Sequence, residues 1–326
     1  MDKSLNKLVF SIDIGGTYTK LGLVDMEKGI EGKAHIDTAR FTNEFDFADA
    51  LYQEFNKLSD GLNYDFVLEG VGVGVPGVTS EDGVVNQIAN IPFLNNVNLI
   101  SLLEDKFNVG VHLSKDSNIA AIGEGAYGEA KGMRNYILLT LGTGLGCSVV
   151  IDGKVLIGET GLAGEFGHAI IEKNGRECGC GRFGCLEAYV SSTGLVRNVV
   201  ELLAHKKMSS PLRDSAFNEL TSKLIFDAAK EGDSIAKEAF LLTGQILGEN
   251  IANLFTLFDP EAVILTGGLA KARTFLEPAI IEKVDCNTLY SLNNNLNIRF
   301  SSLGVNDAAL LGAATLIWND KKEISI

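Results

Sequence analysis

Three of the chain's five cysteines lie within eight positions of one another, close to one of its four histidines. The stretch GEFGHAIIEKNGRECGCGRFGCLE, residues 164–187 and called the knuckle below, contains His168, Cys178, Cys180 and Cys185. One imidazole and three thiolates form the Cys₃His ligand set of a closed structural zinc site. The intervening glycines permit the sharp turns that the spacing Cys-x-Cys-x₄-Cys requires. The sequence therefore predicts one structural Zn²⁺, with free thiols in a glycine-rich loop as the alternative.

Two carboxylates, Glu165 and Glu187, flank this predicted metal site. A metal that fixes the loop would hold both side chains rigidly. Carboxylates on a rigid loop suit bidentate hydrogen bonding to vicinal hydroxyls, which is the chemistry of sugar recognition. The residues alone allow equally well that both glutamates are solvated surface side chains.

Glycine-rich turns follow strand-like segments at three places and offer exposed backbone N–H groups to phosphate oxygens. The first turn is DIGGTYTK, in which the carboxylate at the strand end is suited to hold Mg²⁺ through water. Its predicted nucleotide-binding residues are Asp13, Gly15, Gly16, Thr17, Thr19 and Lys20. A plain β-turn explains one such segment equally well.

The second turn, LGTGLG at 141–146, contributes Thr143 and Gly144, and the third, LTGGLA at 265–270, contributes Gly267 and Gly268. No Gly-Lys-Ser/Thr of a Walker A loop follows, and neither turn opens a helix as a Rossmann fingerprint does. Three such turns at strand ends favour a nucleotide-binding protein.

Asp116 is the candidate general base. It follows a predicted strand and precedes a predicted helix, in the segment LSKDSN at 113–118. Phosphoryl transfer to an alcohol requires a group that accepts the hydroxyl proton, and an aspartate at a strand end can do this. The alternative is that Asp116 or Ser117 only caps the helix that begins near Asn118.

Predicted strands and helices alternate along the chain, and no linker, repeat array or low-complexity segment interrupts them. Strands are expected at 8–14, 20–24, 67–75, 109–114, 135–141, 147–151, 262–265 and 297–302. Helices are expected at 45–58, 118–127, 220–231, 234–258, 275–284 and 308–318. A strand, a glycine turn and a second strand occur twice, near Gly15 and near Gly144. The repetition predicts two α/β lobes of related design with a nucleotide between them.

Composition excludes several classes of protein. The chain has 326 residues, of which 46% are hydrophobic and 21% charged, and its net charge of −14 opposes nonspecific binding to nucleic acid or anionic membranes. The N-terminus has no signal-peptide pattern, and no apolar run approaches a membrane span. Clustered cysteines suit a reducing compartment, so a cytoplasmic protein is expected. Cys147 and Cys286, outside the cluster, are expected to be buried as small hydrophobic residues.

Seven segments resemble the ROK family of bacterial sugar kinases and sugar-responsive repressors, in the order found there. They are DIGGTYTKLGLVD, GVGVPG, KDSNIAAIGEGAYG, LGTGLGCSVVIDG, GLAGEFGHAII, CGCGRFGCLE and DPEAVILTGGL. The resemblance extends from about Leu8 to the C-terminal helix, and ExGH together with CxCGxxGCxE is its most specific part.

This resemblance implies the actin-like, ribonuclease H-like ATPase fold, an α/β fold of two lobes with the active site in the cleft. The N-terminal lobe is expected at 1–120, with a helix at about 306–326 packing back on it, and the second lobe at 121–305. The implied activity is that of an ATP-dependent, glucokinase-like hexose kinase using ATP with Mg²⁺. The family also implies a homodimer.

Site roles follow from the resemblance position by position. Asp116 matches the family's catalytic base, and the turns at Gly15 and Gly144 match its phosphate loops, with Gly267 and Gly268 on the adenosine side. His168 matches both a zinc ligand and a sugar ligand. The sugar-binding positions are Glu165, His168 and Glu187, with Gly77 and Asn90 lining the same pocket.

One position departs from the family pattern. The kinases carry Asn-Asp-x-Asn where this chain has Lys115-Asp116-Ser117-Asn118. Lysine donates hydrogen bonds but cannot accept them, and its charge favours the ionised form of Asp116, which weakens that residue as a base. Because it brings a charge and lacks an acceptor, Lys115 is also expected to change the preferred sugar.

Two other functions compete with a kinase. The family's repressors carry a winged helix-turn-helix ahead of the first phosphate turn, whereas about seven residues precede the first strand here, so DNA binding is not expected. A kinase-like sugar sensor without activity is the other alternative, and Lys115 favours it.

Overall fold

The computed structural model describes residues 5–79, 82–86, 88, 90–289, 296–304 and 307–323. The chain forms two compact units: unit 1 is residues 1–132, 155–163 and 302–326, and unit 2 is 133–154 and 164–301. The expected boundary after residue 120 falls inside helix α3 (Asp116–Tyr127). This helix stays in unit 1 because it packs against α9 (Asp307–Glu323). Within the described ranges, no helix combines the length and apolarity needed to cross a bilayer.

Unit 1 is built on a sheet in the order β3-β2-β1-β4-β8. The strand β1 pairs antiparallel with β2 across the first glycine turn and parallel with β4, which pairs parallel with β8. Carboxyl ends of parallel strands meet at one edge of a sheet, which is where α/β proteins bind ligands. The strands are β1 (Asn6–Ile14), β2 (Tyr18–Asp25), β3 (Gly29–Asp37), β4 (Phe66–Val75) and β8 (Val111–Lys115).

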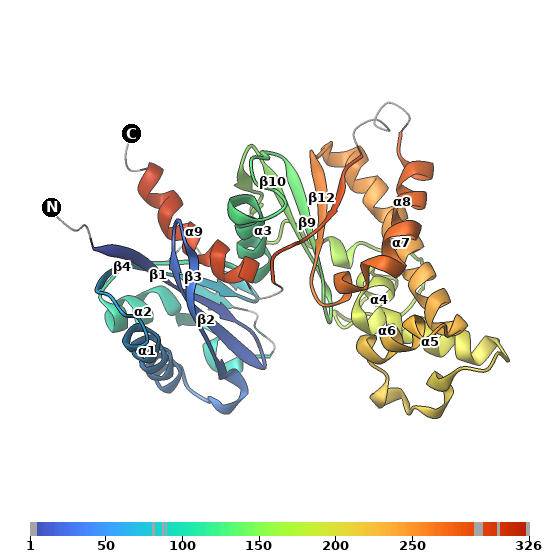
Figure 1. Ribbon diagram of the computed structural model, residues 1–326, viewed down its shortest axis with the longest axis horizontal. Helices are drawn as coiled ribbons and strands as arrows, with labels where there is room; N and C mark the ends of the chain where they lie inside the picture. Colours follow the sequence, from blue (N-terminus) through green and yellow to red (C-terminus); the bar gives the residue numbers. More distant parts are fainter. Residues whose placement is uncertain are drawn as a thin grey trace. The chain divides into compact units, whose positions relative to one another are not determined.

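Helices cover both faces of this sheet (Figure 1). Alternate residues of β1 point to opposite faces. Phe10 and Ile12 join the core under α1 (Glu44–Asp60) and α2 (Leu99–Phe107), whereas Val9 packs against α9. A small sheet of β5 (Val78–Thr79), β6 (Val84–Asn86) and β7 (Val97–Asn98) completes the unit.

Unit 2 repeats this plan with a sheet in the order β11-β10-β9-β12-β13. Its central strand β9 pairs antiparallel with β10 across the second glycine turn and parallel with β12. Both units thus combine a hairpin with a parallel strand, as the repeated glycine turn predicts. The strands are β9 (Tyr136–Leu141), β10 (Leu145–Ile151), β11 (Lys154–Val155), β12 (Ala262–Thr266) and β13 (Ile298–Phe300).

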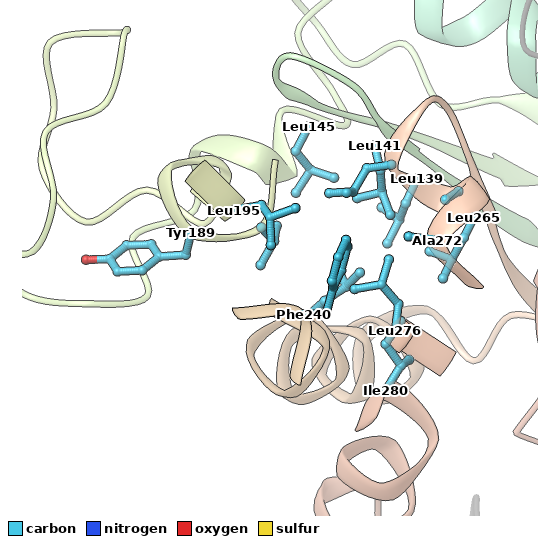
Figure 2. Packing of buried hydrophobic residues seen from close by; sticks show 14 of the residues in the cluster. Leu139, Leu141, Leu145, Tyr189, Leu195, Phe240, Leu265, Ala272, Leu276 and Ile280 are labelled. Carbon is cyan, nitrogen blue, oxygen red and sulfur yellow. The ribbon is translucent and has the colours of Figure 1, made fainter. Parts of the chain in front are cut away.

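The core of unit 2 lies between this sheet and its helices. Figure 2 shows Leu139 and Leu141 of β9 facing Phe240 and Leu276, and the ring of Phe240 stacks on that of Phe275 with centroids 5.4 Å apart. The helices are α4 (Glu187–Val190), α5 (Ser192–His205), α6 (Ser222–Lys230), α7 (Ser234–Phe258) and α8 (Arg273–Asn287). Short 3₁₀ helices lie at Thr38–Arg40, Pro92–Leu94, Phe166–His168, Pro211–Asp214, Phe217–Glu219 and Leu269–Ala272.

Some elements and one burial state differ from the sequence expectations. The strand β3 and the helices α2 and α5 are present although the hydrophobic pattern did not lead us to predict them. Cys147 is buried as expected, but Cys286 is exposed on α8, so its predicted burial is wrong. Cys286 lies in the last turn of that helix, next to the exposed Asp285 and Asn287, and this turn faces solvent.

Glycines bring α3 and α9 into backbone contact in unit 1. A Cβ atom added to Gly312 would lie 1.6 Å from the carbonyl oxygen of Ile119, and one added to Gly123 would lie 1.9 Å from that of Ala308. Neither helix backbone can move aside without disturbing the buried layer around it.

We predict that Gly312→Ala destabilises unit 1 by about 3 kcal/mol, because the new methyl group overlaps the backbone of α3. The single tryptophan, Trp318, is buried on α9 and reports this packing through its fluorescence during denaturant unfolding. Gly110→Ala is the matched control, since a Cβ there meets nothing within 4 Å, and a change of less than about 0.5 kcal/mol is expected. Equal stability of the two variants would contradict the close contact.

Candidate active site

An ion pair marks the carboxyl end of β1. Lys20 Nζ donates to Asp13 Oδ2 at 2.8 Å, and the two residues are direct partners in the β1–β2 register. The Asp13 side chain is 10% exposed and that of Lys20 34%, so the carboxylate is nearly buried and requires its partner. Lys20 also lines a pocket of about 320 Å³ with Tyr18, Lys33 and His35. Lys20 therefore borders space that a small molecule can enter.

The first glycine turn is closed by a hydrogen bond from Gly15 N to Tyr18 O at 3.2 Å. A Cβ atom on Gly16 would lie 3.0 Å from Cβ of Asn90, so this glycine lets the turn approach Asn90 closely. A residue expected to bind sugar thus lies against a turn expected to bind phosphate. The side chain of Thr17 is exposed at the same turn.

Thr19 differs from its neighbours in this turn. It is fully buried, and its hydroxyl lies 2.8 Å from that of Thr38. Its hydroxyl therefore has a structural partner inside unit 1, and the structure gives no support to the prediction that Thr19 binds nucleotide.

Asp116 lies at the same edge of the sheet as Asp13. The β4 residues Gly74 and Val75 pair with Asp13 and Lys115, respectively, so the ends of β1, β4 and β8 are in line. Gly77 lies two residues after the end of β4 and has a φ of 96°, a value that favours glycine. This edge brings together the candidate base, the ion pair and the first glycine turn.

Asp116 is not the N-cap residue of α3. The N-cap of α3 is Lys115, and Asp116 is the first helical residue. Asp116 Oδ1 accepts a hydrogen bond from the backbone N–H of Ser117 at 2.6 Å, which orients the carboxylate. An aspartate in the first helical turn also interacts favourably with the helix dipole.

The four predicted metal ligands lie together in unit 2. Their ligand atoms are all within 4.8 Å of one another. A tetrahedral zinc with Zn–S of about 2.3 Å and Zn–N of about 2.0 Å places two sulfurs about 3.8 Å apart and a sulfur about 3.5 Å from the nitrogen. Cys180 Sγ and Cys185 Sγ are 3.7 Å apart, and Cys178 Sγ is 3.6 Å from His168 Nδ1. The geometry of the cluster fits a tetrahedral zinc ion.

Burial and hydrogen bonding set the protonation of the three cluster thiols when no metal is bound. Burial raises the pKa of Cys178 to about 12 and also raises that of Cys185. Burial would raise the pKa of Cys180 as well, but hydrogen bonds from Arg182 lower it to about 6. Of the three cluster cysteines, Cys180 is therefore the one whose pKa lies below neutral pH when no cation is bound. Zinc requires three thiolates, so binding would release protons from the other two cysteines.

Close backbone contacts place Glu165 and His168 against β10. A Cβ on Gly164 would lie 2.4 Å from the carbonyl oxygen of Cys147, and one on Gly167 would lie 2.4 Å from that of Leu145. The GxxGH spacing therefore presses this segment onto the strand. His168 Nε2, opposite the nitrogen that faces Cys178, lies 3.9 Å from Glu165 Oε2. Both polar groups are part-exposed, so a ligand in solution has access to them.

Arg176 anchors the knuckle to α5, and the sequence alone did not identify it. Its guanidinium donates two hydrogen bonds to the carboxylate of Glu201 at 2.8 and 2.6 Å, and it stacks 4.5 Å from the ring centroid of Tyr189. The hydroxyl of Tyr189 points away from the unit 2 core, as Figure 2 shows, and accepts the backbone N–H of Arg176 at 2.8 Å. Arg182 Nη2 donates to the carbonyl oxygen of His168 at 2.9 Å.

Glu187 reaches the second glycine turn. Its Oε2 accepts the backbone N–H of Leu145 at 2.9 Å, and a Cβ on Gly144 would lie 2.3 Å from this same oxygen. Its Oε1 lies 3.6 Å from Cys178 Sγ. Glu187 therefore connects the knuckle with the turn, and Gly144 is required for that approach.

The second and third glycine turns lie side by side in unit 2. Thr266 pairs with Thr140 in the parallel ladder of β12 and β9, so both turns follow the carboxyl ends of parallel strands. Gly267 has a φ of 98°, and a Cβ there would lie 2.4 Å from the carbonyl oxygen of Leu141. Gly142 and Gly268 have open space around them, and Thr143 is exposed.

Comparison with known proteins identifies the family. Residues 9–320 match the sequence profile of the ROK family. A glucokinase of Thermotoga maritima is 33% identical over 317 residues, which cover 95% of this chain and 96% of that protein. A xylose repressor of Caldicellulosiruptor bescii is 34% identical over 254 residues, 77% of this chain and 63% of the repressor.

A solved structure, a ROK family glucokinase from Streptomyces griseus in complex with glucose and AMPPNP, has a TM-score of 0.79 and 30% sequence identity. It covers 95% of this chain and 98% of that chain. The chain belongs to the ROK family, and the predicted resemblance is confirmed. The α/β fold matches that of ROK sugar kinases, members of the actin-like ATPase superfamily.

We predict about one zinc ion per chain by metal analysis of the purified protein, because the ligand distances fit tetrahedral coordination. Cys185→Ser should lose the metal and lower the melting temperature, whereas Cys286→Ser, which changes an exposed cysteine outside the cluster, should retain it. A folded, active protein without bound metal would show that the cluster is not a zinc site.

Proposed function

We propose that this chain is an ATP-dependent kinase that phosphorylates a hydroxyl of a hexose. The observation that carries the proposal is the position of Asp116 on one sheet edge with the Asp13–Lys20 pair and the first glycine turn. Similarity to a glucokinase over nearly the whole chain supports the same conclusion.

Each group has a distinct role in this proposal. Asp116 accepts the proton of the attacking hydroxyl. The backbone N–H groups of the first two glycine turns and the ammonium of Lys20 bind phosphate oxygens, and Asp13 would hold Mg²⁺ through water. Mg²⁺, when bound with ATP, neutralises charge that develops on the transferred phosphoryl group. The carboxylates of Glu165 and Glu187, with His168 Nε2, bind sugar hydroxyls, and Gly77 and Asn90 line the sugar site.

The proposed zinc is structural. Three cysteines and one histidine fill a tetrahedral shell and leave no position for water, so the metal would support the loop rather than activate a reactant. His168 would bind it through Nδ1 and retain Nε2 for the sugar.

A sugar sensor without kinase activity is the second candidate. The 34% identity to a xylose repressor favours it, as does Lys115 in place of the asparagine of the family's kinases. Lys115 lies at the end of β8, directly before Asp116. Its ammonium group replaces an amide that could both donate hydrogen bonds to a sugar and accept them from it. This change affects the choice of sugar under either function.

A coupled assay of ADP release separates the two functions. We expect turnover with at least one of glucose, N-acetylglucosamine, N-acetylmannosamine, mannose, fructose and allose. Because Lys115 replaces the asparagine, glucose need not be the preferred sugar in this series. Sugar binding measured by calorimetry without turnover of any sugar would instead establish the sensor.

Asp116→Asn should reduce kcat by about 10²–10⁴-fold, because the amide cannot accept the hydroxyl proton. Sugar affinity should remain largely unchanged, since the amide oxygen retains its hydrogen-bonding capacity. The matched control is Asp105→Asn, which changes an exposed aspartate on α2. Retained activity of Asp116→Asn would place the base elsewhere.

A further inference from the structure

We infer that Glu187 positions the second glycine turn, and thereby couples the state of the metal cluster to the affinity for nucleotide. The inference rests on the proposed function, in which this turn binds nucleotide phosphate. It assigns to Glu187 a second role, as a positioning residue for ATP, beyond the sugar contact expected of it.

The first support is the contact between Glu187 and the turn. The carboxylate accepts the Leu145 N–H at 2.9 Å, and hydrogen bonds to a charged acceptor are about twice as strong as neutral ones. The same oxygen fills the space in which a side chain at Gly144 would lie. A carboxylate packed this closely against a turn limits the conformations that its N–H groups can adopt.

The second support is that neighbouring residues of α5 hold the remainder of the turn. The backbone N–H of Ser192 donates to the carbonyl oxygen of Gly142 at 2.9 Å. The hydroxyl of Thr193 donates to the carbonyl oxygen of Thr143 at 2.6 Å. With Glu187, these bonds orient three consecutive peptide groups of the turn from one segment, residues 187–193. In a trans peptide the N–H lies opposite the C=O, so the held carbonyls of Gly142 and Thr143 direct the N–H groups of Thr143 and Gly144 away from α5, as phosphate binding requires.

The third support is the short path from this segment to the metal cluster. Glu187 follows Cys185 by two residues, and both Cys185 and the intervening Leu186 are fully buried. The N–H of Leu186 donates to the carbonyl oxygen of Ala169 at 2.9 Å, next to His168. Glu187 Oε1 also lies 3.6 Å from Cys178 Sγ. Because these contacts leave the start of α4 little freedom, a change in the cluster displaces Glu187 as well.

The experiment measures binding of a non-hydrolysable ATP analogue with Mg²⁺ in the absence of sugar, by calorimetry. Glu187→Ala should bind the analogue about tenfold more weakly than wild type, because one charge-assisted bond is lost. Glu187→Gln should bind with an affinity between those of wild type and Glu187→Ala, since the amide oxygen accepts the same N–H but in a weaker, uncharged bond. Glu177→Ala, which alters an exposed glutamate in the knuckle, is the matched control and should be unchanged.

Thr193→Val separates this role from sugar binding, because Thr193 has no assigned sugar contact. It should weaken analogue binding about threefold and raise KM for ATP, with KM for the sugar unchanged. Removing zinc from the wild type with a zinc-selective chelator should weaken analogue binding in the same direction. The metal content and melting temperature of each variant are measured in parallel.

Wild-type analogue affinity in a folded, metal-loaded Glu187→Ala protein would overturn the inference and leave the proposed function intact. If Glu187→Ala does not fold, Thr193→Val decides in the same way. A wild-type protein that binds no ATP analogue would overturn the proposed function, and this inference with it.

Discussion

A hairpin joined to a parallel strand is the constraint on which both units depend. In unit 1, β1 is paired on one side with β2 and on the other with β4; in unit 2, β9 is paired with β10 and β12. The hairpin requires a tight glycine turn, and the parallel pairing places the next strand end beside it. Candidate phosphate-binding and catalytic groups therefore collect at strand ends in each unit.

Glycines near these sites serve mainly to let other groups approach. Gly16 accommodates Asn90, and Gly144 accommodates the carboxylate of Glu187. Gly164 and Gly167 let the first part of the knuckle lie on β10. Gly142 and Gly268 differ, because a Cβ at either position would meet nothing within 4 Å; the Gly142 N–H instead closes the second turn by donating to Gly144 O at 3.0 Å. The same residue type thus has two physical roles within a few positions.

Protein contacts stabilise the knuckle independently of the metal proposed for it. Arg176 binds Glu201 and stacks on Tyr189, and Arg182 donates to the backbone of His168. Such paired, bidentate contacts add geometric specificity to their energy. These contacts surround the cluster, whose ligand atoms all lie within 4.8 Å of one another. The first part of the knuckle packs on β10 and its last part contacts the second glycine turn, so both parts contact the β9–β10 hairpin of unit 2.

Local patterns in the sequence predicted most of the fold. The buried strands, the long helices and the repeated hairpin follow from hydrophobic period and from glycine at turns, which are short-range properties. The strand β3 was missed because its residues are largely part-exposed. The helix α5 was missed although Ser191 caps its N-terminus, a boundary signal that the sequence contains. The metal cluster was predicted because its ligand types and spacing are themselves specific to one chemistry.

By itself, the sequence determined the ligand set of the cluster, the repeated turns and the family. Only the tertiary structure decided which side chains are buried, which are exposed and which remote groups they contact. Thr19 is buried against Thr38, Cys286 faces solvent, and Glu187 is bonded to Leu145, 42 positions away. These outcomes depend on which side chains meet across distant segments, and a local pattern contains no information on that. Burial and hydrogen bonding between remote residues are set only when the strands pair and the helices pack.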